Sequence, residues 1–275
     1  MKYSKVPVSD KKYLNYIFIE SAVDGKVVTT MFDTRGNTLI KKSIAEKINV
    51  SYIDDKPIDE KRGWRRARVN MRIGGLEIGS APVIIANDDT FDLMQDPQGN
   101  KFPADMILGW NIISQLCFRG DLRKGDFEVQ IDDFRKSRSK DQQNAPVLYI
   151  EFEGERILAA LNSSLPVTNV SQEVFDKIVD KKDTKETVEM LGLNKNENLS
   201  YETTLKFKID QDEISLKGAQ LNPHLNNKDV QIIFGADLLW QTTWAIYSPM
   251  RYIRAKQWYN LIVYKQKWLN QINYL

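Results

Sequence analysis

Cysteine and histidine are almost absent from this chain of 275 residues, which contains one of each. A single cysteine, Cys117, cannot form an intramolecular disulfide, and Cys117 and His224 together cannot supply the ligands of a typical zinc site. A Ser-His or Cys-His catalytic pair also has little support when His224 is the sole histidine. We therefore expect no metal site, and we interpret Cys117 as a small buried hydrophobic residue.

Long apolar runs and a strong net charge are also missing. The formal net charge is +2, so no overall field attracts nucleic acid or a membrane surface. No run approaches the length of a transmembrane helix, and segment 1–12 lacks the apolar core of a signal peptide. Neither a Gly-rich phosphate loop nor a nucleophile elbow is present. We expect a cytoplasmic protein with no membrane span and no cofactor.

One sequence motif occurs twice. In each half a turn glycine is followed by an apolar run, a short polar segment and a stretch with helical spacing. The first apolar run ends at Asp33 and the second at Asn162, at equal distances from the turn residues Gly25 and Gly154. Further downstream, each copy has an apolar segment interrupted by one glycine, and these segments are Met106–Ile113 and Ile232–Leu239. The same order at nearly constant offset indicates an internal duplication.

This order of elements resembles the aspartic protease superfamily. Phe32–Thr38 is similar to the active-site loops of retropepsin-like and pepsin-like enzymes, and Ile107–Gly109 resembles the segment that braces such a loop. The resemblance covers roughly Tyr13–Ile131 and Val147–Ala255. It implies a mostly β fold with two similar acid-protease-like barrel lobes, related by pseudo-two-fold symmetry and carrying short helices.

The duplication also divides the chain. We expect the first lobe over 1–133, a polar linker of mixed charge over 134–144 and the second lobe over 145–255. The tail at 256–275 has apolar residues at helical spacing, so we expect an amphipathic helix that packs on the second lobe. A helix that docks on a partner or a membrane surface is the alternative.

The catalytic dyad implied by the resemblance is incomplete. An aspartic protease needs two adjacent carboxylates that share one proton, because like charges so close cannot both ionise. Here Asp33 keeps the first acid, but the second position is Asn162, whose amide cannot act as a general base. Losing general acid–base function costs about 10²–10⁴-fold in rate. We interpret Asp33 and Asn162 as a degenerate, catalytically impaired dyad.

Two further departures lie beside the dyad. The family's glycine after Asp-Thr is replaced by Arg35 in the first copy and by Ser164 in the second, and a side chain there hinders the approach of backbone amides. The Arg35 side chain either pairs with Asp33 and favours its charged form or points into solvent. The residues expected to line a peptide groove are Thr34, Arg35, Gly36, Trp64, Ser163 and Ser164.

The resemblance also implies a flap, a hairpin that closes over a bound chain, between the first helical stretch and the turn at Gly74 and Gly75. Its candidate tip is Arg62–Arg66, where Trp64 would lie over a bound chain. The surrounding segment Lys61–Arg72 is the densest basic patch, and its charges alternate with apolar residues. We interpret it as the solvated face of a strand, with an acidic peptide or nucleic acid as the alternative ligand.

These observations predict a protein that binds a polypeptide or holds an assembly together and no longer cleaves peptides. One alternative is an active aspartic endopeptidase in which Asp33 pairs with Asp33 of a second chain. Another is an unrelated all-β interaction protein whose Asp-Thr sequence is a coincidence. The distance between Asp33 and Asn162 separates the readings, because only the protease-like ones bring the two residues together. The sequence leaves the partner and the oligomeric state open.

Overall fold

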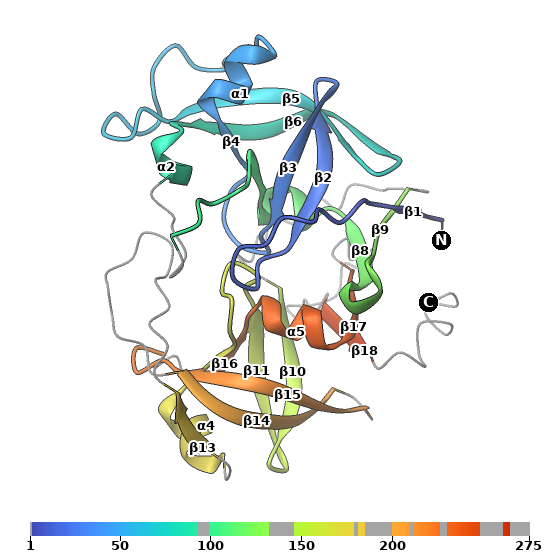
Figure 1. The fold of residues 1–275 in the computed structure, drawn as a ribbon, viewed down its shortest axis with the longest axis vertical. Coiled ribbons are helices and arrows are strands. Elements are labelled where there is room, and N and C mark those ends of the chain that lie inside the picture. The colour runs from blue at the N-terminus through green and yellow to red at the C-terminus, as the bar shows by residue number, and fades with distance from the viewer. Residues whose placement is uncertain are drawn as a thin grey trace, which may run out of the picture.

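The computed structural model describes residues 2–92, 99–131, 146–178, 181–184, 200–209, 212–225, 230–247 and 261–264. The fold is mostly β, with the first half of the chain in one lobe and most of the second half in the other (Figure 1). Within these ranges no helix has the length and hydrophobicity that crossing a membrane requires.

Nine strands and four short helical segments form the described part of the first half. They are β1 (Tyr3–Lys5), β2 (Phe18–Val23), β3 (Lys26–Phe32), β4 (Leu39–Lys41), α1 (Lys42–Lys47), β5 (Arg65–Ile73), β6 (Leu76–Ala86), α2 (Asp89–Asp92), β7 (Met106–Leu108), α3 (Trp110–Ile113), β8 (Cys117–Asp121), the 3-10 turn η1 (Leu122–Lys124) and β9 (Asp126–Gln130). The second half contributes β10 (Val147–Phe152), β11 (Glu155–Leu161), β12 (Asn169–Val170), α4 (Gln172–Lys177), β13 (Lys181–Thr184), β14 (Ser200–Ile209), β15 (Asp212–Leu221), β16 (Ile232–Phe234), α5 (Ala236–Gln241), β17 (Thr243–Tyr247) and β18 (Leu261–Tyr264).

The two lobes are closed barrels with the same topology. The first closes in the order β2-β3-β7-β4-β6-β5, and the second in the order β10-β11-β16-β12-β15-β14. Corresponding neighbours also pair in the same sense: β3–β7 and β11–β16 are parallel, whereas β4–β7 and β12–β16 are antiparallel. The fold class expected from the sequence, two similar β-barrel lobes related by pseudo-two-fold symmetry, is confirmed.

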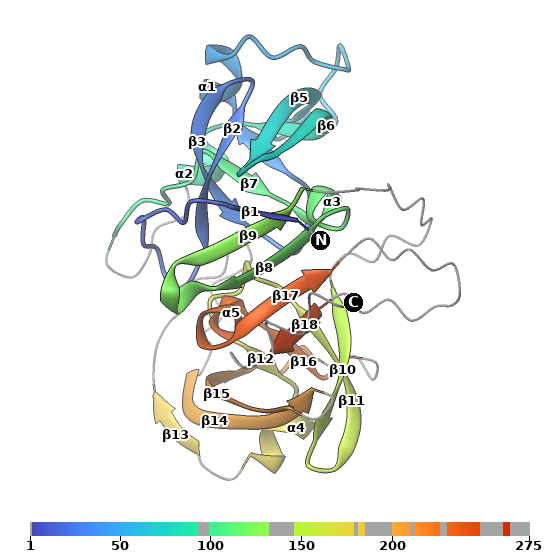
Figure 2. The same ribbon diagram turned by 90° about the vertical axis from the view of Figure 1, so that its right-hand side faces the viewer.

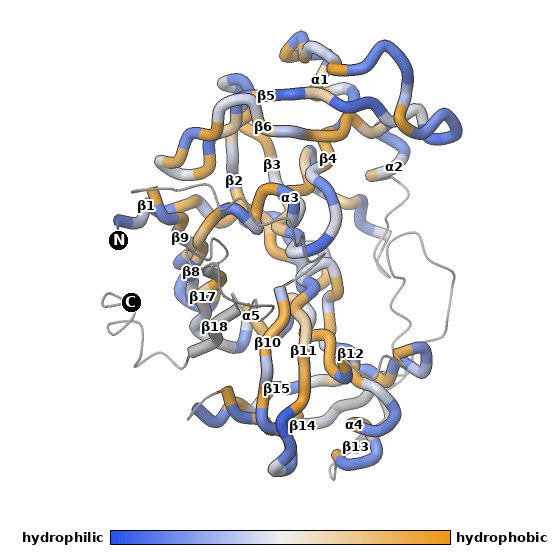
Figure 3. Tube along the Cα trace, turned by 180° about the vertical axis from the view of Figure 1, so that it is seen from behind, coloured by the Kyte–Doolittle hydropathy of each residue, from blue (hydrophilic) through white to orange (hydrophobic). Residues whose placement is uncertain are grey.

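Equivalent tight turns begin each barrel. Asp24 and Gly25 join β2 to β3 with φ angles of 45° and 82°, and Glu153 and Gly154 join β10 to β11 with φ angles of 49° and 78°. Positive φ at both central residues is the signature of the two-residue type I′ hairpin, whose twist matches that of its strands. Along β10 and β11 Figure 3 shows hydrophobic stretches, with hydrophilic residues at the joining turn. The turns and the inward-facing apolar residues therefore set the register together.

The helices α1 and α4, which follow the polar loops after β3 and β11, are shorter than the helical spacing of apolar residues in the sequence predicts. In the first lobe the stretch expected to be helical begins with strand β4, and only Lys42–Lys47 form α1. In the second lobe β12 precedes α4, whose N-terminus is capped by the Ser171 side chain accepting from Val174 N–H. In the first lobe β4 pairs with β7, and in the second β12 pairs with β16. The first residues of each stretch expected to be helical are therefore extended, because they close the barrel.

A five-stranded sheet joins the lobes in the order β1-β9-β8-β17-β18 (Figure 2). At its centre β8 of the first half pairs antiparallel with β17 of the second. The expected helix over the tail is wrong for Leu261–Tyr264, which form β18 against β17, because those four residues satisfy the edge of this sheet. The remainder of the tail and the linker at 134–144 lie outside the described residues.

Aromatic side chains fill the space between this sheet and the first barrel. Phe32, the last residue of β3, lies 5.2 Å from both Phe118 and Phe127 between ring centroids. Trp244 of β17 stacks on Phe32 at 6.3 Å and is fully buried. Such ring pairs contribute about 0.5–1.5 kcal/mol beyond their buried area. The position just before Asp33 is thus anchored by both halves of the chain.

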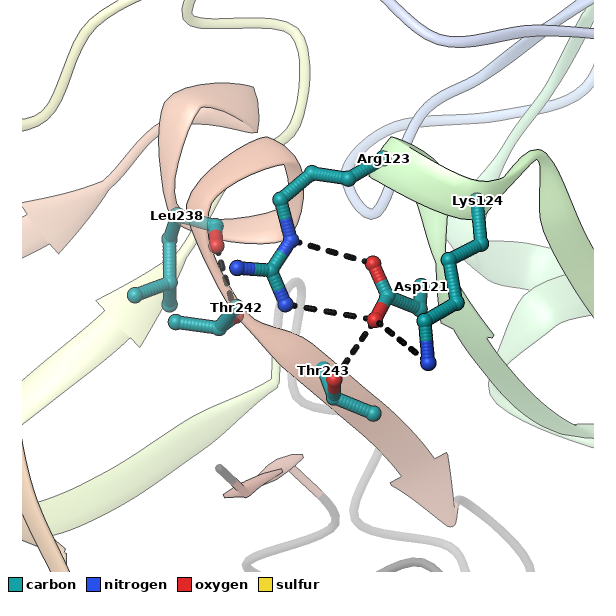
Figure 4. Close-up of polar contacts among 6 residues, drawn as sticks. All are labelled: Asp121, Arg123, Lys124, Leu238, Thr242 and Thr243. Carbon is teal, nitrogen blue, oxygen red and sulfur yellow. Dashed lines mark hydrogen bonds and ion pairs between the residues drawn. The ribbon is translucent and has the colours of Figure 1, made fainter. Parts of the chain in front are cut away.

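A buried acid also links the halves at this sheet (Figure 4). Asp121, at the end of β8, is 1% exposed and accepts hydrogen bonds from the Arg123 guanidinium at 3.1 and 3.2 Å and from the Thr243 hydroxyl at 3.0 Å. The Lys124 ammonium lies 3.8 Å away. Burial raises the pKa of Asp121, but the hydrogen bonds and the two positive charges outweigh it, so its pKa is lowered overall.

Candidate functional site

The two polar loops that follow β3 and β11 meet at the junction of the lobes. Thr34 N–H donates to Ser163 Oγ at 2.9 Å, and Ser163 N–H donates to Thr34 Oγ1 at 3.0 Å. Each hydroxyl then donates to the strand of the other lobe: Thr34 to Leu161 O at 3.2 Å and Ser163 to Phe32 O at 2.8 Å. Both side chains are fully buried, so these four reciprocal bonds fix one loop against the other.

This arrangement makes Asp33 and Asn162 neighbours, because each immediately precedes one of the interlocked residues. Their backbones are held alike, since Asp33 N–H donates to Leu108 O at 3.0 Å and Asn162 N–H donates to Phe234 O at 2.8 Å. The Ser164 hydroxyl donates to Asn162 Oδ1 at 2.6 Å, and the same hydroxyl acts to lower the pKa of the Asp33 carboxyl. The sequence-based expectation that residues 33 and 162 come together agrees with this geometry.

A threonine and an amide brace the first loop. Thr38 N–H and the Thr38 hydroxyl both donate to Asn111 Oδ1 at 2.8 Å, and Gly109 N–H donates to the Thr38 hydroxyl at 3.0 Å. A Cβ on Gly109 would lie 2.4 Å from the Asn37 carbonyl carbon, so this contact requires glycine. The glycine found in the apolar segment of the sequence therefore allows the loop to touch β7.

The second loop is braced in the same way by an acid. Thr168 N–H donates to Asp237 Oδ2 at 3.0 Å, its hydroxyl donates to Asp237 Oδ1 at 2.9 Å, and Gly235 N–H donates to that hydroxyl at 3.2 Å. Burial raises the pKa of Asp237 to about 7, against the opposing effect of these hydrogen bonds. The sequence analysis identified both glycines but not the roles of Thr38, Asn111, Thr168 or Asp237. Asn111 and Asp237 each lie two residues after their glycine, and this equal spacing was available as a signal.

Asp33 lies in an environment that disfavours its charge. Burial raises the pKa of Asp33 to about 7, opposed by the N–H of Arg35, which donates to Asp33 Oδ1 at 2.9 Å, by the Ser164 hydroxyl and by the Arg35 charge. The Arg35 side chain is exposed, which favours the outward of its two expected orientations. Gly36 follows with a φ of 74°, a left-handed conformation that suits glycine. Asp33 is therefore poised to change its charge near neutral pH.

An aromatic cluster forms the first-lobe side of the site. Tyr13, Tyr16 and Phe102 are buried with mutual ring-centroid distances of 5.4–6.5 Å. Burial raises the pKa of Tyr16, and the neighbouring Tyr13 and Asp33 raise it further. Sequence reasoning missed Tyr16, because nothing in the spacing of a strand-forming segment shows that its side chain will approach Asp33.

The expected flap tip belongs to an irregular hairpin that precedes β5. Asp59 pairs with Trp64 across it, and Ile58 N–H donates to Trp64 O at 2.7 Å. The partly buried Trp64 side chain packs against the aromatic cluster, and the Arg62 guanidinium lies 4.9 Å from its ring centroid. Trp64 thus packs against the cluster that contains Tyr16.

The basic segment Lys61–Arg72 is largely matched by its own surroundings. Arg66 donates two hydrogen bonds to the Asp54 carboxylate at 2.6 and 3.0 Å. Arg65 stacks on the Tyr52 ring at 3.8 Å, and Arg68 donates to Ser80 O at 3.0 Å. These contacts favour the interpretation of a solvated strand face.

The arrangement at the junction offers the ionisable carboxyl of Asp33 near the amide of Asn162, which is hydrogen-bonded to the Ser164 hydroxyl. In the part of the chain that the structure describes, no group of three or more histidine, cysteine, aspartate or glutamate side chains is placed to hold a metal ion. The Asp33 carboxyl can take up or release one proton, and the amide and the hydroxyl can form hydrogen bonds. No protein-family model matches this chain, and no curated protein matches it.

Proposed function

We propose that this chain is an aspartic-protease-like protein that binds a polypeptide at the junction of its lobes and does not cleave it. The observation that carries the proposal is the reciprocal bonding of Thr34 and Ser163, which places Asp33 beside Asn162 as the resemblance requires. A duplicated barrel with the same strand order in both lobes supports the same reading.

The pair of Asp33 and Asn162 lacks the second carboxyl that the reaction needs. One acid must take a proton from water while the other protonates the carbonyl oxygen, and an amide cannot exchange a proton in this way. In addition, the Asn162 side-chain oxygen is already occupied, because the Ser164 hydroxyl donates to it at 2.6 Å. Binding is the property that remains, since hydrogen-bonding groups and the aromatic cluster with Tyr16 and Trp64 are retained.

Proteolysis is tested with a peptide library incubated at pH 4 to 7.5, with and without pepstatin, and analysed by mass spectrometry for new termini. The wild-type chain and Asp33→Ala are expected to give the same result, with no pepstatin-sensitive cleavage. A cleavage that disappears in Asp33→Ala would overturn the proposal and favour an active endopeptidase.

Binding is tested with a photo-reactive residue placed at one position at a time. Arg35 is exposed beside Asp33, whereas Val27 is 61% exposed at the β2–β3 turn and serves as the control position. A reduced and carboxymethylated globular protein provides an unfolded polypeptide of known sequence. Crosslinks are expected from position 35 and not from position 27. Equal crosslinking at both positions, or none at 35, would contradict a binding site at the junction.

An active homodimer built on two Asp33 residues is less compatible with this geometry. Thr34 already uses its N–H and its hydroxyl in bonds to the Asn162–Ser164 loop of the same chain. A second chain would have to displace that loop and break all four reciprocal bonds. The single-chain arrangement is therefore the one we propose.

A further inference from the structure

The hairpin of residues 51–64, which contains the expected flap tip, is held together by its own backbone. Near its base Ile53 N–H donates to Arg66 O at 2.9 Å, and nearer its tip Ile58 N–H donates to Trp64 O at 2.7 Å. These bonds join the two sides of the hairpin, so they keep it folded wherever its tip lies. The position of the tip depends instead on contacts with the barrel.

The base of this hairpin is fixed to β5. The Asp54 carboxylate accepts two hydrogen bonds from the Arg66 guanidinium at 2.6 and 3.0 Å, and Asp54 O accepts one from the Arg65 guanidinium at 2.8 Å. Figure 1 shows the hairpin between α1 and β5, on the side of the first lobe opposite the five-stranded sheet. A hairpin anchored at its base alone can rotate about that base, whereas a second anchor at the tip leaves it one position.

The tip is fastened to the barrel at one backbone carbonyl. Asn87, which immediately follows β6, donates from Nδ2 to Arg62 O at 2.8 Å. The next residue of the hairpin, Gly63, has a φ of 65°, a left-handed conformation that suits glycine. A Cβ on Gly63 would lie 3.2 Å from the same Nδ2, so glycine leaves room for the amide to reach the tip. Asn87 thus links the end of β6 to the hairpin.

The Trp64 ring is the second anchor. It packs against the buried aromatic cluster of the first lobe, which contains Tyr16 and Phe102. The Arg62 guanidinium lies 4.9 Å from the centroid of this ring, within the range of a cation–π contact. The indole N–H is buried without a hydrogen-bond partner among the described residues, and this opposes docking of the ring. The packing of Trp64 is therefore partly offset, and the Asn87 bond adds to the docked side.

We infer that Asn87 and Trp64 form a latch that holds the tip of the 51–64 hairpin on the first lobe, so that this hairpin is a fixed wall and not a lid that closes over the junction. The chain thereby departs from the moving flap that the resemblance implies. The inference goes beyond the proposed function and does not depend on it, because the latch belongs to the chain without a ligand. A polypeptide at the junction would enter and leave with no opening step.

The position of the tip is measured in the free chain by pulsed electron paramagnetic resonance between two spin labels. The labels are attached to Lys61→Cys, exposed at the tip, and to Glu20→Cys, exposed on β2 of the same barrel. Cys117 is buried, so the labels react at the two introduced positions. One narrow distance distribution is expected. A broad distribution, or a second distance of similar weight, would overturn the inference.

Removing the anchors should release the tip. Asn87→Ala is expected to lower the ratio of latched to released hairpin about two- to tenfold, which is what one hydrogen bond of ordinary strength contributes. Trp64→Leu removes the ring, and the double variant should show the broadest distribution. If the double variant keeps the narrow wild-type distance, or if Asn87→Ala changes nothing in the Trp64→Leu background, the latch is wrong.

Two controls separate release of the tip from loosening of the barrel. Labels at Glu20→Cys and Glu77→Cys, both on barrel strands, should keep their distance in every variant. Asn70→Ala removes a comparable amide on β5, which donates from Nδ2 to Asp24 Oδ1 at 3.0 Å, and should leave the tip in place. If Trp64→Leu disturbs the barrel pair, the comparison of Asn87→Ala with Asn70→Ala decides alone. The same tip distribution in these two variants would overturn the latch.

Discussion

Asn111 and Asp237 occupy the same position in the two lobes, and each accepts hydrogen bonds from the backbone N–H and the hydroxyl of its own threonine. The amide also donates, from Nδ2 to Pro82 O at 3.1 Å, which an ionised acid cannot do. The same brace is therefore insensitive to pH in the first lobe and titratable in the second.

Replacing Asp237 with asparagine should remove this difference. Burial raises the folded-state pKa of Asp237 to about 7, above its value in the unfolded chain, so the folded state holds the proton more tightly. The contribution of Asp237 to stability is thus greatest below about pH 4 and decreases as pH rises toward 7. The free energy of unfolding of Asp237→Asn should therefore decrease less than that of the wild type between pH 4 and pH 7. At pH 8 it should exceed the wild-type value by an amount on the order of a few kcal/mol.

Urea unfolding at several pH values measures this effect. Asn111→Asp is the matched substitution in the first lobe and should acquire the pH dependence that Asp237→Asn loses. The prediction is wrong if the two variants show the same pH profile as the wild type.

The reciprocal bonds of Thr34 and Ser163 should be strongly coupled. Thr34→Val keeps the shape of the side chain but leaves Leu161 O and Ser163 N–H without their buried partner, at a cost of about 1–3 kcal/mol. Ser163→Ala should cost a similar amount. Denaturant unfolding of both single variants and the double variant measures the coupling, and simple additivity would show that the two loops do not hold each other.

Asp121 should stabilise the lobe junction in a pH-dependent manner. Its folded-state pKa is lowered, so its contribution is present at neutral pH and is lost as pH falls through that value. Asp121→Asn should be less stable than the wild type at pH 7. Its stability should also decrease less than that of the wild type when the pH is lowered. Asp126→Asn is the control, because the 3.5 Å pair of Asp126 with Lys5 is exposed and should matter little. Equal effects of the two substitutions in thermal unfolding would contradict this account.

Gly109 should not tolerate a side chain. Gly109→Ala places a Cβ 2.4 Å from the carbonyl carbon of Asn37 and 2.7 Å from Thr38 N, which are backbone atoms of the loop that carries Asp33. We expect destabilisation of about 1–3 kcal/mol from the enforced shift. Gly79→Ala is the matched control, since its nearest neighbour would be the Asn70 Oδ1 at 4.0 Å. Urea unfolding measures the stability of both variants. Equal free energies of unfolding for Gly109→Ala and Gly79→Ala would contradict the prediction.

The duplication made most of the fold accessible from sequence. A hairpin, an Asp-Thr or Asn-Ser turn and a glycine-containing apolar strand occur in both halves, and local patterns of this kind specify local structure. Two copies then imply a symmetric pair of lobes, which places Asp33 near Asn162 without knowledge of any long-range contact. The duplication does not by itself predict what the protein binds, so the proposed binding function stays a prediction.

The parts that sequence could not supply depend on non-local packing. Leu261–Tyr264 lie within a tail whose apolar residues recur at helical spacing, yet pairing with β17 makes them a strand. Tyr16 lies just before β2 and comes near Asp33 because Phe32 N–H donates to Ile17 O at 2.9 Å. The effect of the Ser164 hydroxyl on the pKa of Asp33 acts across the lobe junction, and no spacing within one motif reveals it.

The order of strands in the junction sheet has a consequence for synthesis of the chain. β8 and β9 emerge from the ribosome well before β17, so a nascent first lobe presents the open edge of β8 together with the rings of Phe32 and Phe127, which Trp244 later covers. Open edges beside apolar surface recruit other strands. The first lobe by itself is thus prone to aggregate, and pairing of β17 with β8 removes the exposed edge once the second half has been synthesised.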